Sequence, residues 1–385
     1  MTTQDRPLRV ALVSETFLPK LDGVTTVMCL LMDHLRKSGA EAILFSGGKH
    51  VESYQGYPVV SITPSIPMPM YPEIKMSLPR RVHFRALQEF DPDILHIANP
   101  MHTGIRFVWF GRRLNKPVAM SFHTHIMEMA KFYHLGFLQR PLWYIHRIVY
   151  KRADYRWATS KRVQAELIEH GFGPTGLWRR GVDSSVFSPH QQQEQMRMRL
   201  TGGQPDKTLL LFVGRVAPEK QIGQIKHVLD AIPNTHLAIV GDGPHREKLE
   251  RHFNGAPVTF AGYLKGKELS AAYSASDVFV FPSAIETFGL VVAEAMATGL
   301  PVVSSRVGGV PEIIETGHNG YIFEPNDIDQ MITYVQELVE NPQKRQEMGQ
   351  KGMAAIQHLT WPVIMDELIE DYRQIIENHQ AKLQQ

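Results

Sequence analysis

Residues 283–303 read SAIETFGLVVAEAMATGLPVV, and this stretch decides the fold of the second half of the chain. The letters around its start, DVFVFPS, give a short run of β-branched and aromatic residues that Pro282 ends, which predicts a buried strand. The apolar run that follows predicts a helix beginning near Thr287. Glu286 then lies in the turn between strand and helix, and Glu294 lies about two helical turns further on.

The start of this helix has the properties of an anion site. The backbone N–H groups of Phe288, Gly289 and Leu290 would lie at its N-terminus, where unpaired amides and the helix dipole favour a negative group such as phosphate. Glu286 and Glu294 add two acceptors for hydroxyl groups. The segment therefore predicts a phosphate-binding turn flanked by two carboxylates.

The chain is long enough for two domains. Its 385 residues exceed one ordinary core, and strand and helix patterns alternate throughout, which predicts two α/β domains. No apolar run approaches the roughly 18 to 20 residues of a membrane span, and the start, MTTQDRPLRV, lacks the apolar core of a signal peptide. We therefore expect a cytoplasmic protein, and its single cysteine, Cys29, excludes an internal disulfide.

Charge is divided unevenly between the two halves. Residues 1–185 contain 24 Lys and Arg against 15 Asp and Glu, a net charge of +9, whereas the remaining residues contain 17 against 24, a net charge of −7. Residues 127–162 interleave aromatic with basic side chains, as binding to an anionic bilayer requires. The aromatics would equally suit a core beneath a solvated basic face. Because no nucleic-acid-binding motif accompanies this stretch, we expect a membrane surface rather than nucleic acid as the partner.

A strand, turn and helix also open the chain. Residues 9–15, RVALVSE, predict a buried strand, and the next segment predicts a helix that Gly23 begins and Gly39 ends. This unit places a phosphate at the helix N-terminus in doubly wound sheets, although G-x-G-x-x-G is absent and an ordinary turn glycine fits Gly23 equally well. Further strands are predicted at residues 41–46, 58–62, 94–97, 118–121 and 155–159.

Two stretches of the first half are candidates for contact with a substrate. Residues 63–79, TPSIPMPMYPEIKMSLP, cannot form a regular helix or a central strand, which predicts a substrate-facing loop. SFHTH at residues 121–125 follows a predicted strand end, where ligand contacts collect in open α/β sheets. His123 and His125 have no third ligand spaced nearby, so we expect one histidine facing a ligand rather than a metal site.

The pair Asp91 and Asp93 has the spacing of a D-x-D metal motif. Asp93 leads directly into the predicted strand ILHIA, so a role in a turn and a cap is the stronger interpretation. We therefore expect no metal site here.

The polar run that follows residue 185 predicts a domain boundary. The expected domains are residues 1–185 and 186–360, and a helix over 361–385 is expected to cross back to the first domain. In the second domain the predicted strands 209–213, 237–240 and 258–260 all run into glycine, which lets the backbone approach a ligand closely. Arg215 and Lys220 follow the first of these strands and can place two positive charges on one diphosphate.

Taken together, these features resemble the retaining glycosyltransferases of family 4. The resemblance covers essentially the whole chain. It implies an α/β protein of GT-B architecture, in which two Rossmann-like doubly wound domains face each other across a cleft. The motifs that carry it are the DGV turn at residues 22–24, SFHTH, GVD at 181–183, Arg215 with Lys220, VGDGP at 240–244, and E-x7-E at Glu286 and Glu294.

The resemblance also implies a role for each candidate residue. His123, which matches a histidine that contacts the donor sugar, and Glu286 would be the catalytic residues. No metal or cofactor is implied, because fixed cations and helix amides stabilise the leaving diphosphate, and the front-face mechanism of the family needs no carboxylate nucleophile. The implied donor contacts are Gly23 with the pyrophosphate, Arg215 and Lys220 with the diphosphate, Tyr263 and Leu264 with the base, Phe288, Gly289 and Leu290 with the phosphates, and Glu294 with the ribose.

Within the family, three segments are most similar to the sulfoquinovosyltransferases of sulfolipid synthesis: SETFLPKLDGV, WRRGVDSSVF and VGRVAPEKQI. The similarity implies UDP-sulfoquinovose as donor, diacylglycerol as acceptor and a peripheral association with the membrane. A sulfonate needs a cation, for which Lys20, Arg179 and Arg180 are candidates. Two alternatives remain: hexosyl transfer from UDP-glucose or GDP-mannose to a lipid or glycan, and a non-catalytic nucleotide-sugar-binding scaffold on membranes.

Overall fold

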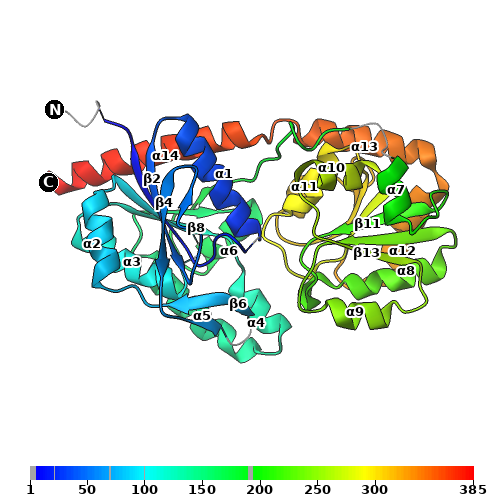
Figure 1. Cartoon of the computed structure of the whole chain (residues 1–385), viewed down its shortest axis with the longest axis horizontal. Helices are drawn as coiled ribbons and strands as arrows, with labels where there is room; N and C mark the ends of the chain where they lie inside the picture. The colour runs from blue at the N-terminus through cyan, green and yellow to red at the C-terminus, as the bar shows by residue number, and fades with distance from the viewer. Residues whose placement is uncertain (1–5, 21, 69–70, 99, 190–193) are drawn as a thin grey trace. The chain divides into compact units, whose positions relative to one another are not determined.

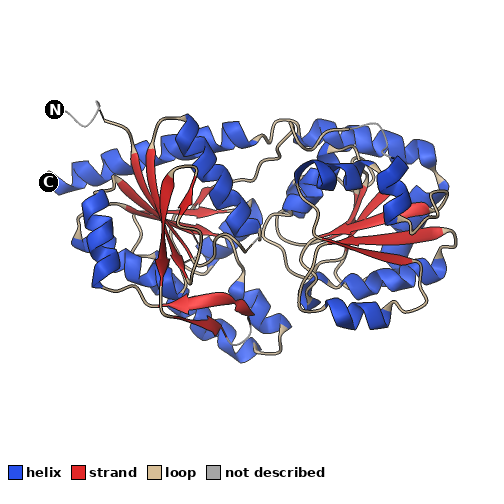
Figure 2. Ribbon diagram, in the orientation of Figure 1, coloured by secondary structure: helices blue, strands red, loops and turns tan. Residues whose placement is uncertain are grey.

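The computed structural model describes residues 6–20, 22–68, 71–98, 100–189 and 194–385. The chain divides into two compact units (Figure 1). Unit 1 consists of Met1–Arg179 together with Pro362–Gln385, and unit 2 consists of Arg180–Trp361. In each unit a sheet is covered by helices on both faces (Figure 2), which confirms the predicted pair of α/β folds.

Unit 1 is built on a sheet with the strand order β10-β9-β8-β7-β1-β2-β4-β3. All neighbours are parallel except the short β3, which pairs antiparallel with β4. The order reverses direction between β1 and β7, where doubly wound sheets open a crevice at the carboxyl ends of the strands. The strands are β1 (Arg9–Ser14), β2 (Glu41–Gly47), β3 (Ser53–Tyr54), β4 (Tyr57–Ile62), β7 (Ile94–Ala98), β8 (Val118–Phe122), β9 (Tyr155–Ala158) and β10 (Gly176–Leu177).

Helices cover the sheet of unit 1, and the first of them begins where the sequence predicts. The Asp22 carboxylate caps the first helix by accepting a hydrogen bond from the Thr25 backbone N–H at 2.8 Å. The predicted start at Gly23 is confirmed. The helices are α1 (Gly23–Lys37), α2 (Arg81–Phe90), α3 (His102–Arg113), α4 (Ile126–Phe132), α5 (Gln139–Tyr150) and α6 (Lys161–Glu169).

The proline-rich stretch at residues 63–79 differs from the predicted loop. It contains β5 (Ser65–Met68) and β6 (Tyr71–Ser77), which pair antiparallel as a separate two-stranded sheet. Each strand of a two-stranded sheet has a free edge, so residues without a backbone N–H are tolerated there. The prolines do exclude the stretch from the central sheet, but the prediction that it lacks strands was wrong.

Unit 2 is built on a sheet in which all neighbouring strands are parallel, in the order β13-β12-β11-β14-β15-β16. This is the doubly wound order, and it reverses between β11 and β14. The strands are β11 (Thr208–Val213), β12 (Thr235–Val240), β13 (Val258–Gly262), β14 (Val278–Phe281), β15 (Val302–Ser305) and β16 (Tyr321–Phe323). The helices are α7 (Glu194–Leu200), α8 (Ile225–Ala231), α9 (Arg246–His252), α10 (Gly266–Ser274), α11 (Leu290–Ala297), α12 (Ile328–Glu340) and α13 (Pro342–Ile356).

The last helix, α14 (Trp361–Leu383), leaves unit 2 and packs on unit 1, as the sequence predicts. Its apolar face is buried, including the full side chain of Tyr372. Polar contacts fix it as well: the Trp157 indole N–H donates to Asp371 at 2.7 Å, and His34 Nε2 lies 2.8 Å from an Asp366 carboxylate oxygen. The helix is therefore an integral part of unit 1.

Candidate active site

The predicted cation and carboxylate of unit 2 meet where its sheet reverses. Lys220 ends a short 3-10 helix after β11, and Glu286 lies in the turn after β14, the neighbouring strand. The Lys220 Nζ atom lies 3.0 Å from Glu286 Oε2 and 5.3 Å from the centre of the Phe281 ring. Both side chains are largely buried, with 15% and 20% of their surfaces exposed. A charged pair is therefore held at the usual ligand position of this fold.

Backbone contacts from two other loops fix the Glu286 turn. The Ala284 N–H donates to the Glu219 carbonyl at 2.8 Å, and the Gly309 N–H donates to the Thr287 carbonyl at 3.1 Å. Gly308, at φ +49°, lies so close that a Cβ atom there would be 2.2 Å from the Glu286 carbonyl oxygen. The glycine turn VGGVPE thus supports the Glu286 turn from behind.

The helix after this turn begins later than predicted. α11 starts at Leu290, with Gly289 as its cap, rather than near Thr287. The Thr287 N–H instead donates to Glu286 Oε1 at 2.9 Å, and the Phe288 N–H also hydrogen-bonds that carboxylate. The positive helix end is therefore at Gly289 and Leu290, because the first amides of a helix have no acceptor within it.

Glu286 is held in its charged form. Burial by itself would raise the pKa of this carboxyl, but Lys220 and the amides of Thr287 and Phe288 outweigh burial and keep the pKa below its usual value. The second predicted cation, Arg215, is half-buried on the loop after β11, and its Nη1 lies 3.7 Å from Glu219 Oε1. The local charge is thus two cations facing carboxylates that partly neutralise them.

Glu294 has the opposite electrostatic environment. It lies half-buried on α11, and its Oε2 accepts a 2.9 Å hydrogen bond from the Tyr273 hydroxyl on α10. Burial raises the pKa of Glu294 from 4.5 to about 7, although the Tyr273 bond opposes the shift. Nothing in the sequence around Glu294 indicates Tyr273, which lies 21 residues earlier on another helix.

The glycines at the strand ends bring loops together. At Gly241, with φ +130°, a Cβ atom would lie 2.0 Å from the Gly214 carbonyl oxygen, so the loops after β11 and β12 touch through their backbones. The Val216 N–H donates to the Asp242 carbonyl at 2.9 Å across this contact. Tyr263 is exposed and donates to the same carbonyl at 3.3 Å, whereas Leu264 is buried. The glycines therefore position the Arg215 loop, a role the sequence did not reveal.

The two histidines of SFHTH have separate roles in unit 1. His123 is buried, and its Nε2 lies 2.6 Å from the Ser121 hydroxyl oxygen. His125 caps α4, where its Nδ1 accepts from the Glu128 N–H at 3.3 Å, and its Nε2 lies 2.8 Å from a Glu166 carboxylate oxygen. Both rings are thus hydrogen-bonded to other groups of the protein.

The three candidate cations for a sulfonate differ in environment. Lys20 lies 3.0 Å from the Asp22 carboxylate that caps α1. Arg179 lies 3.9 Å from Glu367. Arg180 is 4% exposed, and burial lowers its pKa to about 9, so its side chain is largely removed from water.

The aromatic and basic stretch at residues 127–162 divides between a core and a surface. Tyr150 and Trp157 are fully buried, as the core interpretation predicts. Phe137, Tyr144 and Ile145 are exposed by 74%, 57% and 49%, which fits the surface interpretation. Among the described residues, no helix is both long and apolar enough to cross a bilayer. We call the exposed part the α4–α5 surface, and it comprises Lys131, Phe137, Arg140, Tyr144, Ile145, Lys151 and Arg152.

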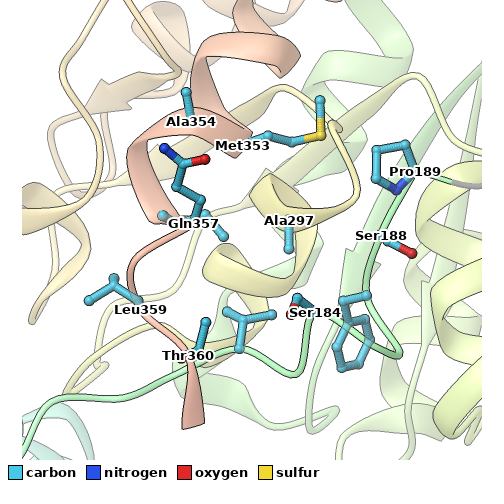
Figure 3. A pocket seen from close by; sticks show the side chains of 12 residues that line it. Ser184, Ser188, Pro189, Ala297, Met353, Ala354, Gln357, Leu359 and Thr360 are labelled. Carbon is cyan, nitrogen blue, oxygen red and sulfur yellow. The ribbon is translucent and has the colours of Figure 1, made fainter. Parts of the chain in front are cut away.

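Unit 2 also contains a hollow of about 340 Å³ (Figure 3). Ser184, Ser188 and Pro189 line one side of it, and Ala297 of α11 and Met353 of α13 line the other. Among the described residues that form its lining, none is a predicted donor contact. The hollow is therefore a feature separate from the Lys220 and Glu286 turn.

Sequence reasoning missed a buried carboxylate in unit 1. Glu15 follows β1, and its Oε1 accepts hydrogen bonds from the backbone N–H groups of Met101, Thr103 and Gly104 at 2.9 to 3.1 Å. Burial raises the pKa of Glu15 to about 7. The signal was present, because an acidic residue directly after an apolar strand is unusual. Its partners, the start of α3, lie 86 to 89 residues away and could not be identified.

Known proteins resemble this chain over nearly its full length. Sulfoquinovosyl transferase SQD2 of Arabidopsis thaliana is 35% identical, over 92% of this chain and 71% of its own. A GDP-mannose-dependent alpha-mannosyltransferase of Mycobacterium tuberculosis is 33% identical, over 96% of this chain and 97% of its own. Among solved structures, Anabaena Alr3699/HepE in complex with UDP has a TM-score of 0.77 at 18% identity, over 95% of this chain and all of that one.

Two family models match successive parts of the chain, and the gap between them lies close to the boundary between the two units. The model described as Glycosyltransferase Family 4 matches residues 21–186, and the model described as Glycosyl transferases group 1 matches residues 198–354. The doubly wound sheet found in each unit agrees with these matches. The chain belongs to the family 4 glycosyltransferases and has the GT-B fold.

Proposed function

We propose that this glycosyltransferase moves sulfoquinovose from UDP-sulfoquinovose to diacylglycerol, with retention of the anomeric configuration and without a metal ion. The observation that carries the transfer is the Lys220 and Glu286 pair, 3.0 Å apart at the carboxyl edge of the unit 2 sheet. The similarity to the Arabidopsis sulfoquinovosyl transferase supports the donor and acceptor.

Different residues of unit 2 bind different parts of the nucleotide-sugar donor. Lys220 and Arg215 attract the diphosphate, together with the amides at the start of α11. Glu286 accepts hydrogen bonds from sugar hydroxyls, since its depressed pKa keeps it an acceptor. Glu294, beside Tyr273, binds the ribose, and the exposed Tyr263 lies next to the base with Leu264. The family resemblance adds Gly23 at the pyrophosphate and His123 at the sugar.

The reaction then needs no nucleophile from the protein. The bond between the anomeric carbon and the diphosphate oxygen breaks as the acceptor hydroxyl oxygen forms its bond to the same face of that carbon. The hydroxyl proton passes to the departing phosphate oxygen. Lys220, Arg215 and the helix amides are fixed before the reaction, so they stabilise the charge that grows on the diphosphate without reorganising.

The donor is tested by a screen of nucleotide sugars. Purified protein with diacylglycerol vesicles should release UDP from UDP-sulfoquinovose and release little nucleotide from UDP-glucose or GDP-mannose. Turnover of GDP-mannose alone would favour the second candidate, mannosyl transfer, to which the 33% identity to the mycobacterial mannosyltransferase points. Binding of UDP without turnover of any donor would favour a non-catalytic scaffold.

The acceptor half of the proposal rests on the α4–α5 surface. Its exposed Phe137, Tyr144 and Ile145 stand among basic residues, the combination that favours the interface of an anionic bilayer. We propose that unit 1 docks there peripherally, on the cytoplasmic side, to reach a lipid acceptor. The hairpin β5–β6 adds the exposed Ile66 to the apolar surface of unit 1.

A further inference from the structure

A chain of buried hydrogen bonds links α14 to His123. The Tyr372 hydroxyl lies 2.5 Å from His96 Nδ1, and His96 Nε2 lies 2.8 Å from the Ser121 hydroxyl oxygen. That oxygen lies 2.6 Å from His123 Nε2. Tyr372 and His96 are fully buried, Ser121 is 1% exposed and His123 is 7% exposed. Four side chains from three segments of unit 1 therefore form one continuous path.

The rings around this path exclude water from it. The His96 ring centre lies 5.0 Å from that of Trp157, 5.1 Å from that of Trp178 and 5.7 Å from that of Tyr372. In such surroundings an unmade hydrogen bond costs more than in water, so the arrangement that satisfies every proton is strongly favoured.

Among the described residues, only one direction of donation along the path satisfies the hydroxyl protons of both Tyr372 and Ser121. Burial raises the pKa of Tyr372 well above 10, so the phenol keeps its proton. Within the described chain, His96 Nδ1 is the hydrogen-bond partner of the Tyr372 hydroxyl, so the hydroxyl must donate to it. His96 then carries its proton at Nε2 and donates to Ser121.

The same logic fixes the last bond. The Ser121 hydroxyl accepts from His96 and donates its own proton to His123 Nε2. If His123 Nε2 carried a proton instead, the Ser121 oxygen would accept from both rings, and its own buried proton would have no acceptor on this path. His123 Nε2 is consequently an acceptor, and the ring carries its proton at Nδ1.

We propose that Tyr372, His96 and Ser121 are positioning residues that hold His123 as the Nδ1-protonated tautomer, so that its ring presents an N–H donor to an oxygen of the donor sugar. The last step rests on the proposed function, because that function supplies the sugar. The tautomer itself rests only on the hydrogen-bond path within unit 1. Tyr372, 249 positions after His123 in the chain, thereby acts on a residue that contacts substrate.

The tautomer is measured without substrate. Long-range proton–nitrogen spectra of the histidine-labelled full chain distinguish a protonated Nδ1 from a protonated Nε2, and the signal lost in His123→Asn identifies His123. The expected wild-type signal is Nδ1-protonated. Tyr372→Phe should convert His96 and His123 into mixtures of tautomers. Tyr57→Phe is the matched control, since it also removes a buried hydroxyl, one bonded to the Ala40 carbonyl at 2.5 Å.

The consequence for transfer is measured separately. With the best donor from the nucleotide-sugar screen, Tyr372→Phe and Ser121→Ala should each lower kcat/KM on the order of tenfold, since a misdirected ring loses its contact with the sugar. UDP affinity should stay within about twofold, because UDP lacks the transferred sugar that His123 is proposed to contact. Tyr57→Phe should change neither quantity.

Two results would overturn the proposal. One is an Nε2-protonated His123 in the wild-type chain. The other is a Tyr372→Phe spectrum, recorded on protein with an unaltered circular dichroism spectrum, that matches that of Tyr57→Phe. If no donor is turned over, the proposed function fails while the tautomer measurement still stands, so the two failures are distinguishable.

Discussion

The contact between Lys220 and Glu286 joins the proposed phosphate-binding cation to the proposed sugar-binding carboxylate. Both side chains are largely buried, and their charged atoms lie 3.0 Å apart. Each therefore neutralises part of the charge with which the other would attract a ligand. A diphosphate that approaches Lys220 therefore competes with Glu286 for the same ammonium group. The ion pair fixes the positions of both side chains. It also weakens the attraction of Lys220 for phosphate.

Removal of Glu286 should separate binding from transfer. Glu286→Ala should lower transfer on the order of a thousandfold, because it removes a fixed group beside the reacting sugar. UDP should bind as well as before or more tightly, since Lys220 loses its competing carboxylate. Calorimetry with UDP and a nucleotide-release assay measure the two effects. Catalysis that survives the substitution would refute the role given to Glu286.

Glu294 should make stability depend on pH. The pKa of the Glu294 carboxyl is 4.5 when it is exposed to water, as in an unfolded chain, and about 7 in the folded chain. The folded state therefore binds the proton more tightly than the unfolded state. The stabilisation is complete below about pH 4.5 and is lost as pH rises towards 7, an effect on the order of 2 kcal/mol. Urea unfolding of unit 2 at about pH 5 and pH 8 should show this difference in the wild type.

The control is Glu294→Gln, which keeps the shape and removes the titration. Its stability should change much less between the two pH values. Glu15, whose pKa is also raised to about 7, contributes in the same direction but belongs to unit 1 and is present in both proteins. An unchanged pH dependence in the variant would show that Glu294 titrates normally.

At the scale of residues, the sequence predicts a site residue when the elements that position it lie next to it in the chain. Lys220 and Glu286 each follow a strand that is evident in the sequence, and parallel strands end at one edge of a sheet. Tyr273 and Tyr372 could not be found, because they act on Glu294 and His96 across 21 and 276 residues. No periodicity or turn signal reports which helix a buried hydroxyl will face.

At the scale of elements, the contact between the loops after β11 and β12 leaves no room for an added side chain. Gly241→Ala would place a methyl group 2.0 Å from the Gly214 carbonyl oxygen. The loops must separate, which should cost about 2 to 4 kcal/mol and weaken UDP binding by moving Arg215. Urea unfolding and UDP calorimetry measure the two effects.

Gly255→Ala provides the matched control for that substitution. Gly255 also has a positive φ, +80°, yet a methyl group there would meet nothing within 4 Å. It should cost only the backbone term of about 1 kcal/mol and leave UDP binding unchanged. Equal losses in both variants would mean that backbone conformation, not the loop contact, explains the effect.

Some strands and helices can be predicted from the sequence and others cannot. Buried parallel strands have apolar residues on both faces, so β1, β7, β11 and β14 appear as continuous apolar runs. The start of α11 was misplaced by about one turn because the amides of Thr287 and Phe288 bond the Glu286 side chain instead of a ligand or helix. The β5–β6 pairing depends on contacts between segments that carry no alternating pattern.

At the scale of the molecule, the charge asymmetry predicts where a membrane binds. Vesicle cosedimentation should rise with anionic lipid and fall with salt. The double substitution Arg140→Glu and Lys151→Glu on the α4–α5 surface should weaken partitioning on the order of tenfold or more, at about 1 kcal/mol for each basic residue near the surface.

The matched control reverses two exposed lysines of unit 2, Lys248→Glu and Lys351→Glu. It changes net charge by the same amount, so it should affect only the long-range attraction and weaken partitioning much less. Equal losses in the two double variants would show that overall charge, rather than the α4–α5 surface, governs binding. Partitioning that is indifferent to anionic lipid would refute the docking proposal altogether.

The return of α14 to unit 1 has a consequence for biosynthesis. A ribosome makes residues 1–179 of unit 1 before any of unit 2, but it makes residues 362–385 of unit 1 only after all of unit 2. Unit 1 therefore begins to fold first and is completed second. Until Tyr372 has emerged, His96 lacks its hydrogen-bond partner on α14, so a chain whose translation stops before Tyr372 lacks the first member of the proposed path to His123. The order of synthesis thus places the completion of unit 1, and with it the proposed positioning of His123, after the whole of unit 2 has been made.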